Sequence, residues 1–305
     1  MRLSVKSIQL PGNAVKRHSK WDREAFLFLL PYLGYLTFFV VYPFYMAISG
    51  SLSDWDILSG EMKFRGLYYY GKLLQDSSFY GSLKNSLVYW SVQVPPSILF
   101  GLGVAVLLNQ PIHLRAAFRS IFFMPVVTPI VTLAVVWAWL YQSNGGLINT
   151  VLSMVGIPPI PWLTSESWSM PSIGIMKIWT DVGFYSVLFL AALQQVPNDL
   201  IDAAKVDGAN AWQIFINVKV PILNPTIVFA LLMGTIWGMQ IFTEPFLMTG
   251  GGPLGSSRTV ILYMYEVGFI KSELSYGSAI GVVTALIILA ITLVQKRMVE
   301  RNVSF

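Results

Sequence analysis

The sequence contains no cysteine and only two histidines among its 305 residues. Without cysteine there can be no disulfide framework, no thiolate metal site and no cysteine nucleophile. The two histidines, His18 and His113, lie far apart in polar segments, so neither a metal centre nor a histidine-dependent catalytic triad is expected. Charge is also scarce: 11% of the residues are charged, whereas soluble domains carry about 25%.

What the sequence has instead is apolar surface. Hydrophobic residues make up 55% of the chain, and the mean hydropathy is +0.62. One water-soluble core could not bury so much, which predicts an all-α polytopic membrane protein with a single membrane domain over residues 25–297. A membrane helix needs about 20 mainly apolar residues. Six stretches qualify, at 25–49, 86–108, 117–141, 172–193, 222–243 and 278–295.

The distribution of lysine and arginine predicts the orientation, because cytoplasmic segments are enriched in these residues. If the N-terminus lies inside, the segments on that side carry 13 of them and the other side six. Residues 1–24 and 298–305 are therefore expected to be cytoplasmic tails. The first of these lacks the apolar core and cleavage site of a secretion signal, so we expect it to be retained.

The segment from residue 197 to 225 is polar but patterned like folded structure. Asn198 can cap a short helix, and the Asp207-Gly208 pair predicts a turn that ends it. Asn210, with Gln213 three residues on, can cap a second helix. Two short helices at an angle would form a rigid projection, which we call the 198–220 loop.

This segment resembles the EAA loop of ABC importer permeases, in which Glu-Ala-Ala is followed by a glycine and an apolar stretch ending in prolines. It is most similar to the carbohydrate-uptake branch, the group that contains the maltose permease subunits. Asp202 replaces the usual glutamate and keeps the charge on a shorter side chain. The stretches Phe64–Tyr70 and Thr249–Pro253 also fit the family. The matching positions of the loop are Asp202, Ala203, Ala204, Asp207, Gly208, Ala209, Phe215, Pro221 and Pro225.

The resemblance implies the type I permease fold of ABC importers, with six transmembrane helices in the cytoplasmic (inner) membrane of a prokaryote. The chain would be a non-catalytic subunit without a cofactor, forming half of a sugar pathway. Its implied partners are a second, homologous permease, two cytoplasmic ATPase subunits that bind ATP and Mg²⁺, an extracytoplasmic solute-binding protein, a carbohydrate and the lipid bilayer. No nucleic acid is expected. The 198–220 loop would dock on an ATPase subunit.

Lys177 and Asp181 lie four residues apart within the fourth predicted span, on one helix face. Intramembrane charges are costly and usually face a bundle interior. One interpretation is an internal ion pair, or a Lys177 side chain that extends to the membrane surface. The other is a substrate pathway, because the resemblance implies sugar-facing positions here and in the fifth span. Those positions are Lys177, Asp181, Phe184, Trp237, Gly238, Gln240 and Ile241.

Two questions stay open at this level. If Lys177 faces the pathway, it would favour an acidic saccharide such as a uronate oligomer, whereas Asp181 offers it an internal partner. Two other functional classes are also conceivable. A secondary transporter of small polar solutes would need paired broken helices in inverted repeats. A membrane-embedded enzyme would need a clustered polar site at membrane depth, and the sequence indicates neither feature.

Overall fold

The computed structural model describes residues 20–56, 59–111 and 113–299. Residues 1–19 and 300–305 of the predicted tails, including His18, lie outside the described residues. The chain divides into two compact units, Met1–Ala47 and Ile48–Phe305, which are described separately.

The described part of the first unit, from Lys20 on, is a mainly apolar helix with one π-helical turn. Helix α1 (Lys20–Leu36) passes through a π-helical turn, η1 (Thr37–Val41), into α2 (Tyr42–Ser51), which runs on into the second unit. Pro43 explains the turn, because it offers no N–H to the carbonyl four residues earlier and its ring crowds that carbonyl. The stretch Phe26–Ser51 is long and apolar enough to cross a membrane.

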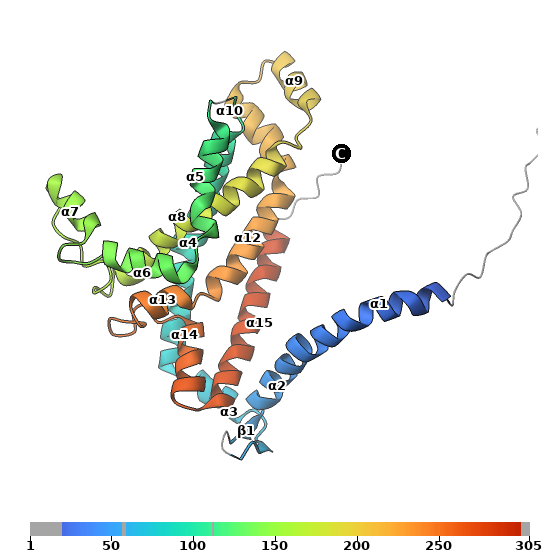
Figure 1. Ribbon diagram of the computed structural model, residues 1–305, viewed down its shortest axis with the longest axis vertical. Helices are drawn as coiled ribbons and strands as arrows, with labels where there is room; N and C mark the ends of the chain where they lie inside the picture. The colour runs from blue at the N-terminus through green and yellow to red at the C-terminus, as the bar shows by residue number, and fades with distance from the viewer. Residues whose placement is uncertain (1–19, 57–58, 112, 300–305) are drawn as a thin grey trace, which may run out of the picture. The chain divides into compact units, whose positions relative to one another are not determined.

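Four long helices form the body of the second unit (Figure 1). They correspond to the second, fourth, fifth and sixth predicted spans, and with the remaining helices they confirm the all-α prediction, apart from one small hairpin. The long helices are α4 (Ser77–Leu108), α8 (Ser169–Leu193), α12 (Asn224–Met239) and α15 (Leu274–Val299).

Small residues allow these helices to approach closely. A Cβ atom added to Gly101 of α4 would lie 2.4 Å from the Cβ atom of Tyr185 on α8. One added to Gly183 of α8 would lie 2.1 Å from the carbonyl oxygen of Phe122. Close backbone contact of this kind is how membrane helices associate where the solvent offers little hydrophobic driving force. Helix α8 is therefore fixed between two neighbours, and Tyr185 and Phe189 on it are fully buried.

Helix α4 begins nine residues before the predicted span 86–108. Asp76 caps it by accepting a hydrogen bond from the backbone N–H of Ser78 at 2.9 Å. The hydropathy signal starts later, because Lys84 and Asn85 lie in the first turns. Pro95 and Pro96 lie inside the helix without ending it.

The third predicted span, 117–141, is not one straight helix. It consists of α5 (Arg115–Val127) and α6 (Ile130–Leu140), which meet at an angle of 96°. Thr128 at the junction is extended, with ψ of 134°, as expected for a residue that precedes a proline. The described chain therefore has five candidate spans, or six if this bent pair counts as one.

The fifth predicted span, 222–243, contains a second break. Helix α12 ends at Met239, and a short helix, α13 (Thr243–Met248), follows after three residues. Pro245 accounts for the break, because it cannot donate to the carbonyl of Ile241, four residues earlier. That carbonyl instead accepts a hydrogen bond from the Thr259 hydroxyl at 2.9 Å, so the break leaves no unpaired carbonyl there.

The 198–220 loop forms two short helices, as its sequence predicts (Figure 1). Helix α9 (Asn198–Val206) ends before Gly208, whose φ of +82° is a backbone conformation suited to glycine. Helix α10 (Ala211–Ile214) begins with a capping box between Asn210 and Gln213. The predicted cap of α9 is wrong by one position, since Pro197 precedes the helix and Asn198 is its first residue. The chain continues through η2 (Phe215–Lys219) and α11 (Val220–Ile222) into α12.

The end of the second unit opposite the 198–220 loop holds a small hairpin and short helices (Figure 1). Strands β1 (Ser53–Trp55) and β2 (Met62–Phe64) pair antiparallel, with Ser53 opposite Phe64. Each strand is only three residues long, and within residues 20–299, apart from the undescribed positions, this hairpin is the one departure from helices and their connections. The short helices there are α3 (Tyr68–Leu74) and α14 (Val260–Tyr265), and α14 continues into η3 (Glu266–Ile270). Helix α7 (Leu147–Met154) lies instead at the side of the unit, beyond α6 (Figure 1).

Candidate functional site

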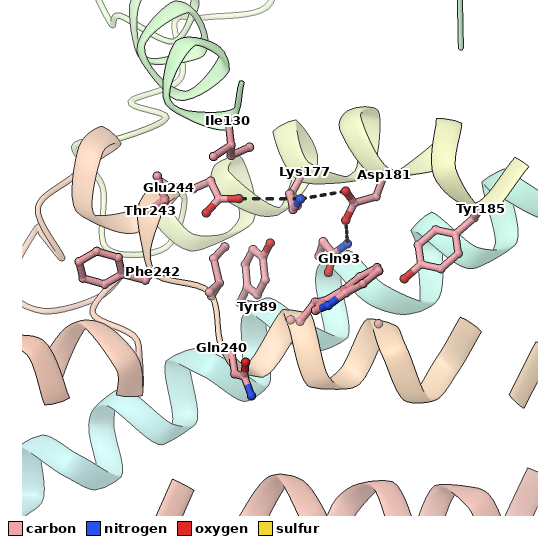
Figure 2. A pocket seen from close by; sticks show the side chains of 14 residues that line it. Tyr89, Gln93, Ile130, Lys177, Asp181, Tyr185, Gln240, Phe242, Thr243 and Glu244 are labelled. Atoms are coloured by element: carbon pink, nitrogen blue, oxygen red, sulfur yellow. Dashed lines mark hydrogen bonds and ion pairs between the residues drawn. The ribbon is translucent and has the colours of Figure 1, made fainter. Parts of the chain in front are cut away.

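A cavity of about 290 Å³ lies where α12 breaks, and we call it the Lys177 cavity. It is bounded by α4, α8, the start of α6 and the α12–α13 break (Figure 2). Of the seven predicted pathway residues, six line it: Lys177, Asp181, Trp237, Gly238, Gln240 and Ile241. The seventh, Phe184, lies behind the lining, with its ring 5.4 Å from that of Trp237 in an edge-on contact.

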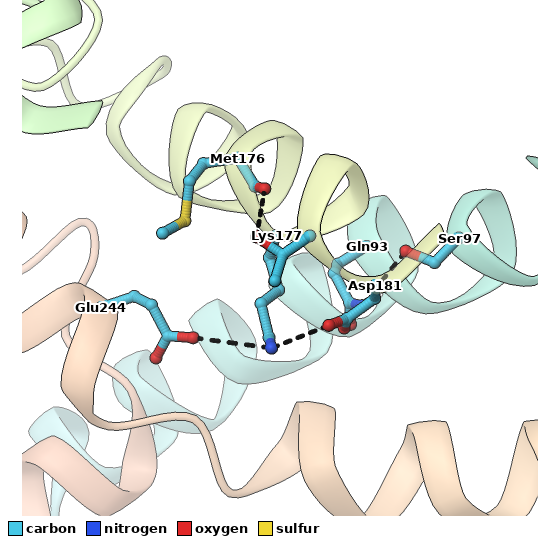
Figure 3. A network of polar contacts seen from close by, with 7 residues as sticks. Gln93, Ser97, Met176, Lys177, Asp181 and Glu244 are labelled. Carbon is cyan, nitrogen blue, oxygen red and sulfur yellow. Dashed lines mark hydrogen bonds and ion pairs between the residues drawn. The ribbon is translucent and has the colours of Figure 1, made fainter. Parts of the chain in front are cut away.

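The charged side chains of this cavity form a row (Figures 2 and 3). Lys177 Nζ lies 2.9 Å from Asp181 Oδ1, and the side-chain amide of Gln93 on α4 donates to Asp181 Oδ2 at 2.8 Å. Lys177 Nζ also lies 3.9 Å from Glu244 Oε1 on α13. The internal ion pair that the sequence left open is therefore present, and it lies in the wall of the cavity.

The row is largely withdrawn from solvent. The side chains of Lys177 and Asp181 are 24% and 20% exposed, and that of Glu244 is 7% exposed. A desolvated charge is stable only when it is paired and its remaining hydrogen-bonding capacity is used. Asp181 meets this condition through its contacts with Lys177 and Gln93. The hydrogen bond from Gln93 also links α8 to α4.

Sequence reasoning missed several residues of the cavity, among them Tyr89, Gln93, Tyr185 and Glu244. Glu244 fell one position beyond the predicted end of the fifth span, although Pro245 next to it signals a helix break. Gln93 and the tyrosines are uncharged residues within apolar helices, so hydropathy does not single them out.

The predicted coupling residues lie on the 198–220 loop, except Pro221, which directly follows it in α11. Asp202 is exposed and pairs with Lys205 at 2.9 Å. Ile214 anchors α10 with 7% exposure, whereas Val206 and Trp212 are 88% and 70% exposed. The loop therefore has a buried attachment and an apolar outer surface. The other predicted positions, Ala203, Ala204, Asp207, Gly208, Ala209, Phe215 and Pro221, are exposed or half-buried around it.

A second polar cluster joins three helices at the end of the unit that carries the hairpin. The Asp76 carboxylate accepts hydrogen bonds from the hydroxyls of Tyr263 and Tyr276, besides capping α4. Partial burial acts to raise the pKa of Asp76. The hydrogen bonds from the two tyrosines and from the backbone of Ser78 and Phe79 outweigh it, so the pKa lies below its ordinary value of 3.8.

Residues 97–304 match the family described as the binding-protein-dependent transport system inner membrane component. The match covers more than half of the chain, so the chain belongs to this family. It is a membrane permease subunit of an ABC transporter and not an enzyme, as its sequence predicts.

The chain is similar to several permeases named for carbohydrate uptake, which confirms the resemblance to that branch. It is 32% identical to the sulfoquinovosyl glycerol transport system permease SmoG of Agrobacterium fabrum, over 96% of this chain and 97% of that one. It is 30% identical to the lactose transport system permease LacF of Rhizobium radiobacter, over 93% and 95%. A chain of a bacterial alginate ABC transporter has the same fold, with a TM-score of 0.79, 23% identity and coverage of 92% and 94%.

Proposed function

We propose that this chain forms half of the translocation pathway of an ATP-driven importer for a sugar or oligosaccharide, and that the Lys177 cavity is part of that pathway. The observation that carries the proposal is the convergence of six predicted pathway positions, from α8, from α12 and from the break that follows α12, on one cavity. Aromatic rings such as that of Trp237 stack on the apolar faces of sugars, and Gln240 offers an amide for hydrogen bonds. The curated relatives named for lactose and for trehalose/maltose transport support a saccharide.

The proposed assembly contains a second, homologous permease, two ATPase subunits and an extracytoplasmic solute-binding protein. The alginate transporter of the same fold was solved with its periplasmic protein, which supports this type of partner. The exposed Val206 and Trp212 offer the apolar surface that a docking ATPase subunit would cover. ATP and Mg²⁺ would bind to the ATPase subunits, and both ends of this chain would lie in the cytoplasm.

Coupling would proceed through the backbone that joins the 198–220 loop to the cavity. From Phe215 to Met239 the chain is helical except at Leu223, through η2, α11 and α12. A force applied to α9 and α10 would therefore move α12, which carries Gly234, Trp237 and Gly238 into the cavity wall. Such a rigid-element relay suits a switch between inward-open and outward-open states.

An acidic saccharide is a second candidate substrate. A lysine in the cavity favours it, and a structure of the same fold is described as an importer of the acidic polysaccharide alginate. At 24% identity that likeness extends to the fold alone. The two carboxylates beside Lys177, those of Asp181 and Glu244, weigh against this candidate.

Reconstitution tests the proposed function. We expect the chain to co-purify with a second permease and with ATPase subunits in fixed proportion. In proteoliposomes, ATP hydrolysis should rise when the solute-binding protein is added with its saccharide. Co-purification without any nucleotide-hydrolysing subunit, or transport driven by an ion gradient alone, would favour a secondary transporter and overturn the proposal.

A further inference from the structure

Glu244 has an unusual position for a buried carboxylate. It lies in the first turn of α13, directly after the break in α12, and only 5% of the residue is exposed. Its side chain lines the Lys177 cavity and points along the row of charges toward Lys177 (Figure 2). A carboxylate can accept about four hydrogen bonds, and one that is this deeply buried must find its partners within the protein or in a bound ligand.

Within the described residues, Glu244 has few such partners. Its carboxylate interacts with its own backbone N–H and with Lys177 Nζ, which at 3.9 Å is beyond hydrogen-bond distance. Asp181 holds the same ammonium group at 2.9 Å and receives a further hydrogen bond from Gln93. The lysine charge is thus balanced mainly by Asp181, and Glu244 retains unused acceptor capacity that faces the cavity.

The charge of the cavity follows from this arrangement. Two carboxylates and one ammonium group line it, which leaves one formal negative charge. An entering carboxylate would meet repulsion from Glu244, and Lys177 is already engaged on its other side. A neutral saccharide meets no such penalty, because its hydroxyl groups donate hydrogen bonds that a carboxylate accepts, with charge-assisted strength.

We propose that Glu244 is a substrate-binding and specificity-determining residue of the pathway, which accepts hydrogen bonds from the hydroxyls of a neutral saccharide and disfavours uronates and other anionic sugars. This inference rests on the proposed function and adds the charge class of the substrate. The neighbouring rings of Trp237 and Phe242 complete a site for a polyhydroxylated, uncharged ring.

The test uses the complete transporter, and its first step selects a probe. Neutral oligosaccharides, among them lactose and maltotriose, and galacturonate oligomers are screened for stimulation of ATP hydrolysis in the presence of the solute-binding protein. The most active neutral saccharide is then compared with its counterpart oxidised to the carboxylate at C6. Both are titrated against the transporter in nanodiscs without the binding protein, with saturation-transfer NMR as the readout of weak binding.

We expect the wild-type transporter to bind the neutral member at least tenfold more tightly than the oxidised one. Glu244→Gln should weaken binding of the neutral saccharide several-fold and reduce the discrimination between the two to threefold or less. The matched control is Glu266→Gln, which removes a partly buried glutamate beside a single cation, Arg258 at 3.5 Å, away from the cavity. The control should leave both affinities unchanged.

The outcomes separate the two proposals. If no saccharide of either kind stimulates ATP hydrolysis or binds, the proposed sugar function fails and this inference fails with it. If galacturonates are the most active probes for the wild type, or if Glu244→Gln binds like the wild type with unaltered discrimination, the sugar function stands and the role of Glu244 is overturned. Because Glu244→Gln preserves shape, retained binding of the neutral probe also shows that the variant is folded.

Discussion

Trp237 lies at the rim of the Lys177 cavity, half exposed, where its ring can meet a sugar entering beside Gln240. An aromatic contact of this kind contributes about 0.5–1.5 kcal/mol, which corresponds to about 2- to 10-fold in affinity. Trp237→Ala should therefore raise the sugar concentration needed for half-maximal stimulation of ATP hydrolysis by that factor. Trp139→Ala is the control, since Trp139 is 59% exposed on α6 and does not line the cavity. Equal effects of the two changes would contradict a pathway role for Trp237.

Asp76 permits a prediction about stability. Its hydrogen bonds to Tyr263 and Tyr276 hold the starts of α4, α14 and α15 together. Asp76→Asn keeps a good helix cap but loses the charge, so we expect the free energy of unfolding at neutral pH to fall by about 1–3 kcal/mol. Thermal unfolding in nanodiscs would measure it, with the exposed Asp199→Asn as a control that should change little.

The pH dependence of this effect has a definite sign. Because the pKa of Asp76 in the folded protein lies below its ordinary value of 3.8, the stabilisation is fully present above that value. It is lost as the pH falls through the lower folded-state pKa. The difference between wild type and Asp76→Asn should therefore stay constant from neutral pH down to about pH 4. A difference that disappears near pH 6 would show that another group is responsible.

At the scale of elements, the 198–220 loop carries the coupling prediction. Gly208 has positive φ, and no atom lies within 4 Å of the position of an added Cβ. Gly208→Asp costs the backbone about 1–2 kcal/mol and places a charge on the proposed docking surface. We expect the variant to remain in the membrane and to hydrolyse ATP while sugar uptake falls to background.

The hairpin end offers a matched control for this change. Gly60 also has positive φ, at +71°, with open space around its Cβ position. Gly60→Asp therefore imposes the same local strain far from the loop along the chain. Normal uptake with Gly208→Asp, or an equal loss with Gly60→Asp, would contradict the coupling role.

The two helix breaks, between α5 and α6 and between α12 and α13, show which features of the helices could not be predicted from the sequence. The apolar stretches 117–141 and 222–243 predict two continuous spans, and α8 and α15 show that such predictions can hold. Pro129 and Pro245 lie at the breaks, but Pro95 and Pro96 lie inside α4 without interrupting it. The presence of a proline in the sequence therefore does not by itself predict a helix break. At α13 the carbonyl of Ile241, which Pro245 leaves without a helical donor, is satisfied by a distant partner, the Thr259 hydroxyl. Local sequence contains no such information.

The same reasoning applies to the cavity. Intramembrane charges made Lys177 and Asp181 visible in the sequence, and the resemblance to permeases supplied Trp237 and Gln240. Glu244 became a neighbour of Lys177 only because the chain turns after α12. Most residues of the predicted pathway could thus be identified from the sequence. The net charge of the cavity could not, because it depends on Glu244 being brought next to Lys177 by the fold.

For the whole molecule, the absence of cysteine makes the predicted orientation directly testable. Single cysteines at Val206, 88% exposed in the loop, and at Lys63, with 80% of its side chain exposed in the hairpin, would react without background. In intact cells, a membrane-impermeant maleimide should label Lys63→Cys and should label Val206→Cys only after lysis. The reverse pattern would place both ends of the chain outside.

The pairing of Lys177 with Asp181 has a consequence for transport. Both residues belong to α8, so their ion pair does not require any other helix to keep its position. Glu244 belongs to α13, and its contact with Lys177 is longer, at 3.9 Å. Separating these two side chains when the pathway opens would therefore cost little free energy. The charge of Lys177 would then be balanced by Asp181 both when the sugar enters and when it leaves. Each turnover would proceed without dismantling and rebuilding a buried ion pair.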